Sequence, residues 1–175
     1  MNLSILNPRK SLNKAFLKVK PNRSGIETFK NNLIYLINNI NENETEEFHK
    51  GLVSTFLKKT YYDPNHFVNT KGRNDLVIHN GKDPQSTVGV IIETKKPGKK
   101  ADMLQPGHVN VKALQELVLY FLRERITLHN LEVKYLIATD IYQWFIFDAQ
   151  VFEKAFAQNK WLVSQFTEFE RKTFQ

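Results

Sequence analysis

The chain has 175 residues, of which 41% are hydrophobic and 12% aromatic; this composition fits one globular domain and excludes a disordered protein. Lysine and arginine outnumber aspartate and glutamate by 25 to 18, and the net charge of +7 suits a polyanionic partner such as nucleic acid, although a solvated basic surface would give the same counts. The absence of cysteine excludes disulfides and thiolate metal sites. Because no apolar run suits a signal peptide or a membrane span, we expect a soluble cytoplasmic protein.

The first third of the chain is predicted to be helical. Residues 1–23 are basic and interrupted by prolines, which predicts an N-terminal arm. The sequence "SGIE" predicts a capping box with Ser24 as the N-cap, followed by a helix of about 16 residues. A second helix is predicted after "NENETEEF", where Asn and Thr can cap it and the first turn is acidic. Its apolar stripe consists of Phe48, Leu52, Val53 and Phe56.

The rest of the chain alternates between strand and helix patterns. "NDLVIH" and "TVGVIIETK" are separated by the turn formers "NGKDPQS", which predicts a β-hairpin. A basic loop, "KPGKKADMLQPGH", leads to the amphipathic helix "VNVKALQELVLYFLRERI". Two further strands, "VKYLIAT" and "WFIFDA", precede a helical tail. We therefore expect an α/β fold of the α+β type, with a small mixed sheet of about four strands flanked by helices, as a single domain over residues 24–175.

Two charged residues interrupt the apolar strand that ends in "VIIETKK". Side chains alternate along a strand, so Glu93 and Lys95 share one face, while apolar residues on both faces indicate a buried central strand. Burying such charges is costly unless they are paired or bind a metal. Asp75 begins the preceding strand, so the hairpin brings it towards Glu93, and two carboxylates together suit Mg²⁺. An E-x-K triplet alone is a weak signal, because any strand edge can carry an ion pair.

The pattern resembles a known nuclease family. "ND" at 74–75 and "ETK" at 93–95 are similar to the PD-(D/E)XK nuclease signature. The chain from about Asn7 to Phe156 resembles the N-terminal nuclease-like domain of type IIG restriction–modification enzymes, which join an endonuclease to an adenine methyltransferase. The stretches that carry this resemblance are "ETEEFHKGLVSTFLKKTYY", "GRNDLVIH", "GVIIETKKP", "ALQELVLYFLRERI" and "IATDIYQWFIFDA".

The resemblance implies a restriction-endonuclease-like fold and a Mg²⁺-dependent endonuclease that hydrolyses phosphodiester bonds in double-stranded DNA. Asp75 and Glu93 would bind Mg²⁺, or Mn²⁺ in its place, and Lys95 would position or activate the attacking water. Asn74 stands where the signature has proline, and the acid that carries the chemistry is kept. We expect Asp75→Ala or Lys95→Ala to abolish cleavage and to leave folding intact.

Two helical residues are further candidates by the same resemblance. The family often adds an acid from the helix before the hairpin, and "ETEEF" offers Glu46 and Glu47. We favour Glu47 as a metal ligand, because it lies close to the border of the apolar stripe; a solvated acid in the first turn is the alternative. Gln115 is a candidate accessory residue, but its spacing to Tyr120 is one residue longer than the familiar Gln–Tyr pattern, and a glutamine on the helix surface is the favoured alternative.

Basic residues surround the candidate site in the sequence. Lys96, Lys99 and Lys100 follow the Glu93–Lys95 triplet, and Lys71 and Arg73 precede Asp75, so all of them are candidates for DNA phosphate contacts. A solvated basic loop is the alternative. The histidines show no paired ligand spacing and are expected on the surface or in loops: His49, His66, His79, His108 and His129.

The resemblance also implies partners. No methyl-donor loop or "NPPY"-like tetrapeptide is present. The resemblance then implies methyltransferase and target-recognition domains that are covalently joined to this domain in a full-length protein, with a homodimer as a candidate arrangement for cleavage; a natural stand-alone relative is the alternative. One alternative is a nuclease fold that has lost catalysis and serves as a DNA-binding or scaffolding module of a DNA methyltransferase. Another is a basic protein-interaction domain.

Overall fold

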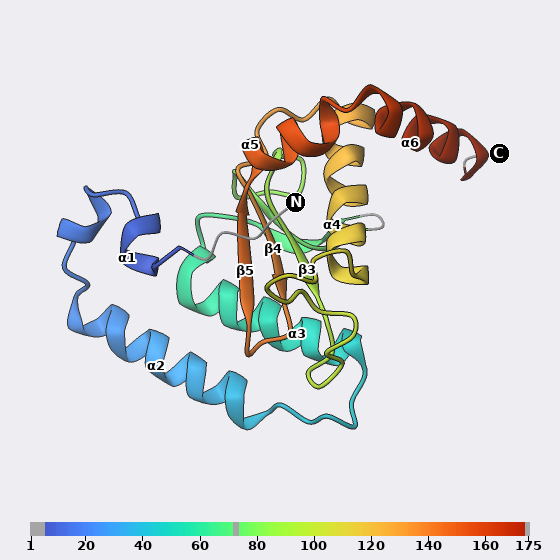
Figure 1. Cartoon of the computed structure of the whole chain (residues 1–175). Coiled ribbons are helices and arrows are strands. Elements are labelled where there is room, and N and C mark those ends of the chain that lie inside the picture. The colour runs from blue at the N-terminus through green and yellow to red at the C-terminus, as the bar shows by residue number, and fades with distance from the viewer. Residues whose placement is uncertain (1–5, 72–73, 174–175) are drawn as a thin grey trace.

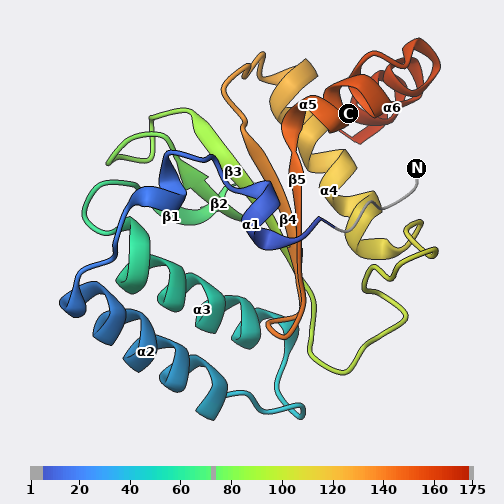
Figure 2. The ribbon, with the colours of Figure 1, turned by 60° about the vertical axis from the view of Figure 1, so that its left-hand side comes forward.

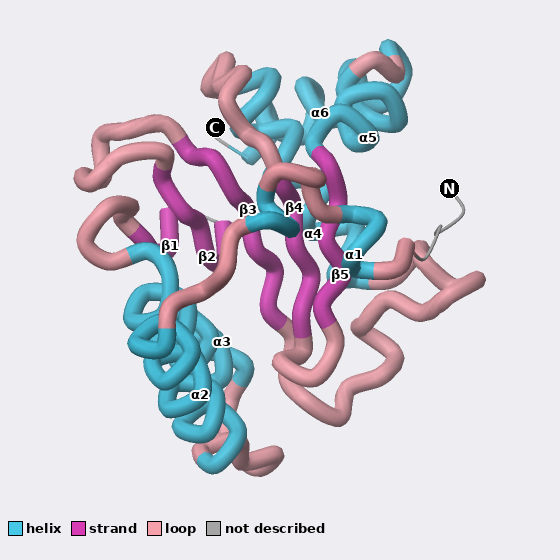
Figure 3. Tube along the Cα trace, turned by 90° about the vertical axis from the view of Figure 1, so that its left-hand side faces the viewer, coloured by secondary structure: helices cyan, strands magenta, loops and turns pink. Residues whose placement is uncertain are grey.

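A mixed five-stranded sheet forms the centre of the computed structural model, which describes residues 6–71 and 74–173 (Figure 1). The strands lie side by side in chain order, as Figure 3 shows. The α+β class predicted from the sequence is therefore confirmed. The five strands are β1 (Val68–Lys71), β2 (Asn74–His79), β3 (Val88–Thr94), β4 (Tyr135–Thr139) and β5 (Trp144–Asp148).

The pairing of the strands makes β3 the centre of the sheet. β1, β2 and β3 pair antiparallel, β3 and β4 pair parallel, and β4 and β5 pair antiparallel. The predicted β2–β3 hairpin is confirmed, with Leu76 opposite Ile92. The sequence-based expectation of about four strands missed β1, because its four residues "VNTK" are too short and too polar to show an alternating pattern.

Six helices accompany the sheet in the described part of the chain. None of them is long and apolar enough to cross a membrane. They are α1 (Pro8–Ser11), α2 (Arg23–Asn38), α3 (Glu46–Leu57), α4 (Lys112–Leu122), α5 (Ala149–Phe152) and α6 (Lys160–Thr173). Of these, α3, α4 and α5 each continue into a short π turn.

The N-termini of the two long helices before the sheet depend on different cap residues. The side chain of Thr45 accepts a hydrogen bond from the Phe48 N–H at 3.2 Å and caps α3, as expected. The prediction of Ser24 as the cap of α2 was wrong, because Asn22 accepts the Gly25 N–H at 2.6 Å. Asparagine caps as well as serine does, so the cap lies two residues earlier than predicted and the helix begins at Arg23.

Helices cover both faces of the sheet, and each face has its own apolar core (Figure 2). Ile91 of β3 faces the core built with α4 and α5, whereas Ile92 faces the core built with α2 and α3. Both side chains are fully buried. This arrangement confirms that β3 is a central strand with apolar residues on both faces, and it places the end of β3 between α3 and α4.

Candidate functional site

A buried ion pair lies at the C-terminal end of β3. Glu93 is 2% exposed and Lys95 is 1% exposed, and the Lys95 ammonium is ion-paired with the Glu93 carboxylate. The Lys95 N–H donates to the Thr139 carbonyl at 2.8 Å, so the pairing of β3 with β4 continues past the end of the strand. The backbone of β4 therefore holds that of Lys95, and the Lys95 side chain shares a face with Glu93, as alternation requires.

Both flanking helices add a carboxylate to this pair. Glu46, the first residue of α3, places Oε1 3.3 Å from Lys95 Nζ, and Glu116 of α4 places Oε2 2.6 Å from it. The side chains of Glu46 and Glu116 are 37% and 28% exposed, so the group opens to solvent on the helix side. We call Glu46, Glu93, Lys95 and Glu116 the Lys95 cluster.

The cluster keeps Lys95 charged. Burial by itself lowers the pKa of the Lys95 amine, because a low-dielectric surrounding disfavours the ammonium. The negative charge of Glu93, the hydrogen bonds from Lys95 to Glu116 and Glu93, and the charge of Glu46 outweigh burial and raise the pKa of Lys95 above its ordinary value. Lys95 is therefore a hydrogen-bond donor and a positive charge near neutral pH, and it is a poor proton acceptor.

The acid that α3 contributes is Glu46, whereas the sequence favoured its neighbour Glu47. The Glu47 side chain is 74% exposed and is ion-paired with Lys50 on the surface of α3. The position of the buried face around α3 explains why Glu46, and not Glu47, contacts Lys95. Phe48 is 39% exposed while His49 is 1% exposed, so the buried face runs through His49 and Val53 and includes position 46.

The same shift of one residue occurs in α4. Gln115 is exposed and donates to Asn110 Oδ1 at 3.1 Å, away from the cluster, whereas Glu116 reaches Lys95. Ala113 is fully buried and extends the apolar stripe of α4 towards Glu116. The signal that could have identified Glu116 is its spacing of three residues from Ala113, which puts the two on one helix face.

The structure describes only the backbone of Asp75. It belongs to β2, and Leu76 pairs with Ile92, so the register continued by one residue sets Asp75 opposite Glu93. Residues directly opposite each other in an antiparallel pair share a face of the sheet. The side chain of Asp75 and all of Arg73 lie outside the described residues.

The predicted DNA-contacting lysines divide into two groups. Lys99 and Lys100 are exposed and Lys96 is half-buried in the loop that leaves the Lys95 cluster. Lys71 lies elsewhere, since its ammonium donates to Glu124 Oε1 at 3.2 Å and Glu124 is 1% exposed. The loop lysines can therefore meet a ligand at the cluster, whereas Lys71 is engaged by a buried carboxylate.

The donor chemistry of the Lys95 cluster fits Mg²⁺ or Mn²⁺. Its carboxylates offer only oxygen donors, which these hard cations prefer. Among the described side chains, which do not include that of Asp75, no three His, Cys, Asp or Glu residues form a group that could hold a metal ion. The Lys95 ammonium lies between the glutamates, and the oxygen donors beside it come from Glu93, Glu46 and Glu116.

The histidines do not contribute to the cluster, but two of them are not surface residues as expected. His49 and His79 are each 1% exposed. His49 Nδ1 lies 2.8 Å from the Thr45 carbonyl, and the ring nitrogens of His79 bond to the Ser86 carbonyl and to Asn69 Oδ1 at 2.6 and 2.9 Å. Polar partners therefore hold both nitrogens of His79 and Nδ1 of His49, whereas His49 Nε2 is buried and has no hydrogen-bond partner among the described residues.

Comparison with known proteins gives a family without an assigned activity. No curated protein and no solved structure matches the chain. The family model described as "Domain of unknown function (DUF7149)" matches residues 6–175. That range includes the whole sheet, its helices and the Lys95 cluster, and the chain therefore belongs to the DUF7149 family.

Proposed function

We propose that this chain is a Mg²⁺-dependent DNA endonuclease domain with Glu93, Lys95 and Asp75 at its centre. The observation that supports the proposal is the Lys95 cluster, a buried Glu–Lys pair at the end of a central strand that receives one carboxylate from each flanking helix. The resemblance of the sequence to the nuclease-like domain of type IIG restriction–modification enzymes agrees with it. The cytoplasm is the compartment we propose for this activity.

Each member of the site has a role that follows from its position. Glu93, Glu46 and Asp75 would hold the cation, and Glu46 replaces Glu47 in the proposed ligand set because its carboxylate faces Lys95. The bound cation would act as a Lewis acid at the scissile phosphate and would lower the pKa of a bound water. Because Lys95 is an ammonium, it would donate hydrogen bonds to a phosphate oxygen and stabilise the charge that develops there.

The exposed lysines of the following loop would hold the DNA backbone. Lys99 and Lys100 can each neutralise a phosphate without carrying sequence information. Sequence recognition would then come from target-recognition and methyltransferase domains joined to this chain, as the resemblance implies. Cleavage of both strands would require two copies of the site, for which a homodimer is the simplest arrangement.

A second candidate function is a nuclease fold that binds DNA without cutting it. The observation that favours it is the ammonium of Lys95 between the glutamates, because carboxylates that already share an ammonium partner can be purely structural. The two functions differ in whether the cluster binds a divalent cation, which a direct measurement decides.

The test is calorimetric titration of Mn²⁺ and Mg²⁺ into the purified chain, beside the variants Glu46→Gln and Glu47→Gln. The two positions are adjacent in α3, but only Glu46 contacts Lys95, so each variant controls for the other. We expect Glu46→Gln to weaken cation binding at least tenfold and Glu47→Gln to leave it within twofold. Equal effects, or no cation binding by the wild type, would favour the non-cutting function.

Cleavage is measured with the same proteins on supercoiled plasmid in the presence of Mn²⁺. Nicking or linearisation by the wild type and by Glu47→Gln, with loss in Glu93→Gln, supports the nuclease. Melting temperatures of all variants show that each is folded, which matters most for Glu93 because it is buried. A plasmid that is cut equally by Glu93→Gln contradicts the proposed site.

A further inference from the structure

The turn between β4 and β5 contains a residue in an unfavourable backbone conformation. Ile141 has a φ of 76°, in the left-handed region that favours glycine. A β-branched side chain is rarely found there, because its Cβ substituents crowd the neighbouring carbonyl. Such conformations persist only where the surroundings enforce them, and they occur most often where a protein positions a functional group.

Side chains around the turn enforce this conformation. Ile141 is 5% exposed and packs into the core shared with α3. Its N–H donates to Thr139 Oγ1 at 3.0 Å, and its carbonyl accepts the Trp144 Nε1–H at 2.8 Å. Asp140 Oδ1 accepts the Gln143 N–H at 2.7 Å. The tip of the hairpin is therefore fixed by packing and by hydrogen bonds on both sides of Ile141.

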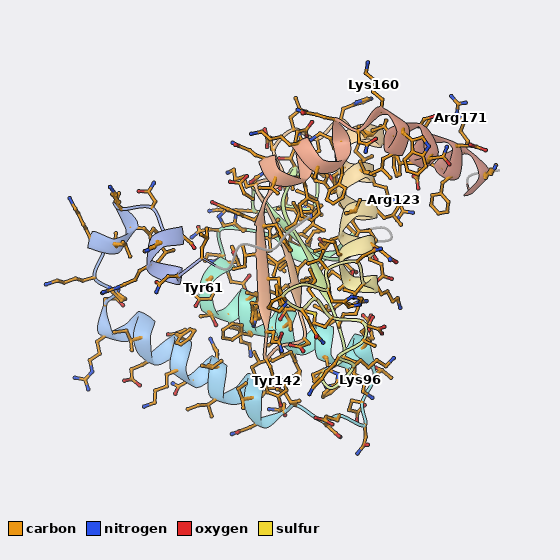
Figure 4. The ribbon with its side chains drawn as sticks, viewed as in Figure 1. Tyr61, Lys96, Arg123, Tyr142, Lys160 and Arg171 are labelled. Atoms are coloured by element: carbon orange, nitrogen blue, oxygen red, sulfur yellow. The ribbon has the colours of Figure 1, made fainter. Side chains whose placement is uncertain are left out.

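The residue that this rigid turn presents to solvent is Tyr142. Tyr142 is 59% exposed, although Ile141 next to it is almost fully buried. Thr139 pairs with Thr94 and accepts the Lys95 N–H, so the turn begins one residue beyond the backbone contact with the Lys95 cluster. Figure 4 shows Tyr142 and Lys96 at the same end of the sheet. An exposed aromatic ring, a basic loop and the candidate site thus lie at one edge.

A hollow of about 330 Å³ lies beside the turn. Its polar lining comes from Asp140 and Gln143 of the turn and from Lys100 and Gln105 of the basic loop. Amide and carboxylate groups of this kind can exchange hydrogen bonds with the edge of a nucleobase. The loop is anchored there, because Met103 and Leu104 are buried in the core on the α4 side.

We propose that Tyr142 is a base-stacking residue and that the hollow beside the turn receives the edge of an unpaired nucleobase of DNA. The choice of DNA rests on the proposed function, whereas the stacking follows from an exposed aromatic side chain on a turn that packing and hydrogen bonds hold. A strand whose base stacks on Tyr142 would meet the end of the sheet where Lys96 also lies. The domain would therefore prefer DNA with an unpaired base near the bond to be cut, such as a flipped base, a frayed end or a single strand.

The test is fluorescence anisotropy with a fluorescein-labelled single strand of 20 nucleotides and with the duplex of the same sequence. EDTA is present throughout, so the measurement is independent of cation binding and of cleavage. We expect Tyr142→Ala to weaken single-strand binding by about 5- to 100-fold, as loss of one stacked base does. Tyr142→Phe should stay within twofold of the wild type, because phenylalanine keeps the stacking face.

The matched control is Tyr135→Ala. Tyr135 begins β4, the strand that leads into the turn, at the opposite end of the sheet and is 49% exposed, so it tests whether any exposed tyrosine of this hairpin would serve. We expect its affinity to remain within twofold of the wild type. Both tyrosines are exposed, and melting temperatures verify that the variants keep the fold.

Several results would overturn the proposal. The first is that the wild type binds neither the single strand nor the duplex at low salt. The second is that the affinity of Tyr142→Ala for the single strand stays within twofold of the wild-type affinity. Equal losses in Tyr142→Ala and Tyr135→Ala would show a nonspecific effect and would also reject it. If only the nuclease proposal is wrong, the result is different. The protein then binds DNA in a way that depends on Tyr142, but it neither binds Mn²⁺ nor cuts plasmid.

Discussion

Replacing Lys95 by methionine removes the positive centre of the Lys95 cluster and keeps the volume of the side chain. Three carboxylates then remain without the ammonium that neutralises them, and Glu93 is 2% exposed. Methionine fills the space of the lysine stem, so a cavity contributes little to the expected change. The variant therefore isolates the electrostatic contribution of Lys95 to stability.

The expected loss follows from burial. Removing one partner of a buried ion pair costs about 3–5 kcal/mol, because the remaining charge is left uncompensated. Glu46 and Glu116 are each about a third exposed, so water screens part of their repulsion, and we take the lower value of about 3 kcal/mol. For a chain of this size, that loss lowers the melting temperature by about 6–12 °C.

The assay is thermal and urea unfolding of Lys95→Met beside Lys112→Met. Lys112 lies on α4, 3.9 Å from the other oxygen of Glu116, but its side chain is 55% exposed. Its replacement should change the unfolding free energy by no more than about 0.5 kcal/mol. Equal stabilities of Lys95→Met and the wild type would refute the reasoning, because they would show that the buried charges are not coupled.

The remaining predictions concern a buried polar residue and the basic loop. Asn130 donates hydrogen bonds to the Val88 carbonyl and to Glu124 Oε2, both at 2.9 Å. We therefore expect Asn130→Ala to lower the free energy of unfolding in urea by about 2–3 kcal/mol, and a decrease of less than about 0.5 kcal/mol would contradict this role. If Lys99 and Lys100 contact phosphates of duplex DNA, the double variant Lys99→Ala/Lys100→Ala should reduce the slope of log K against log salt concentration by about 1.8. An unchanged slope in anisotropy titrations would show that the loop does not touch the DNA backbone.

The stability expected for Lys95→Met differs from one expectation drawn from the sequence. From the sequence alone, we expect replacement of Lys95 by alanine to abolish cleavage and to leave folding intact. The structure places Lys95 at 1% exposure among three carboxylates, so loss of its charge should affect folding as well as any catalysis. Cleavage assays of such variants therefore need a parallel measurement of the folded fraction.

Apolar periodicity was enough to predict the α+β class, the long helices and the β2–β3 hairpin, because these elements have strong local patterns. It was not enough to predict which face of α3 and α4 turns towards Lys95. The sequence candidates Glu47 and Gln115 each lie one residue away from Glu46 and Glu116, whose side chains reach Lys95. The phase of a helix depends on every buried residue, and His49 and Ala113 are buried without being strongly apolar. Their burial is decided by the sheet that packs against them, which a local pattern does not contain.

The parallel pairing of β3 with β4 has a consequence for how the domain folds. The β2–β3 and β4–β5 hairpins are local, whereas Thr94 and Thr139 meet across the whole basic loop and α4. Contacts between residues so distant in sequence carry a large loop-closure entropy and form late. Lys95 belongs to the first hairpin and Tyr142 to the second, so the edge that holds both is assembled only when the two halves dock. A protease cut at the exposed residues 98–101 would leave Lys95 and Tyr142 on separate fragments. If mixing the two fragments restores DNA binding, the two halves have docked.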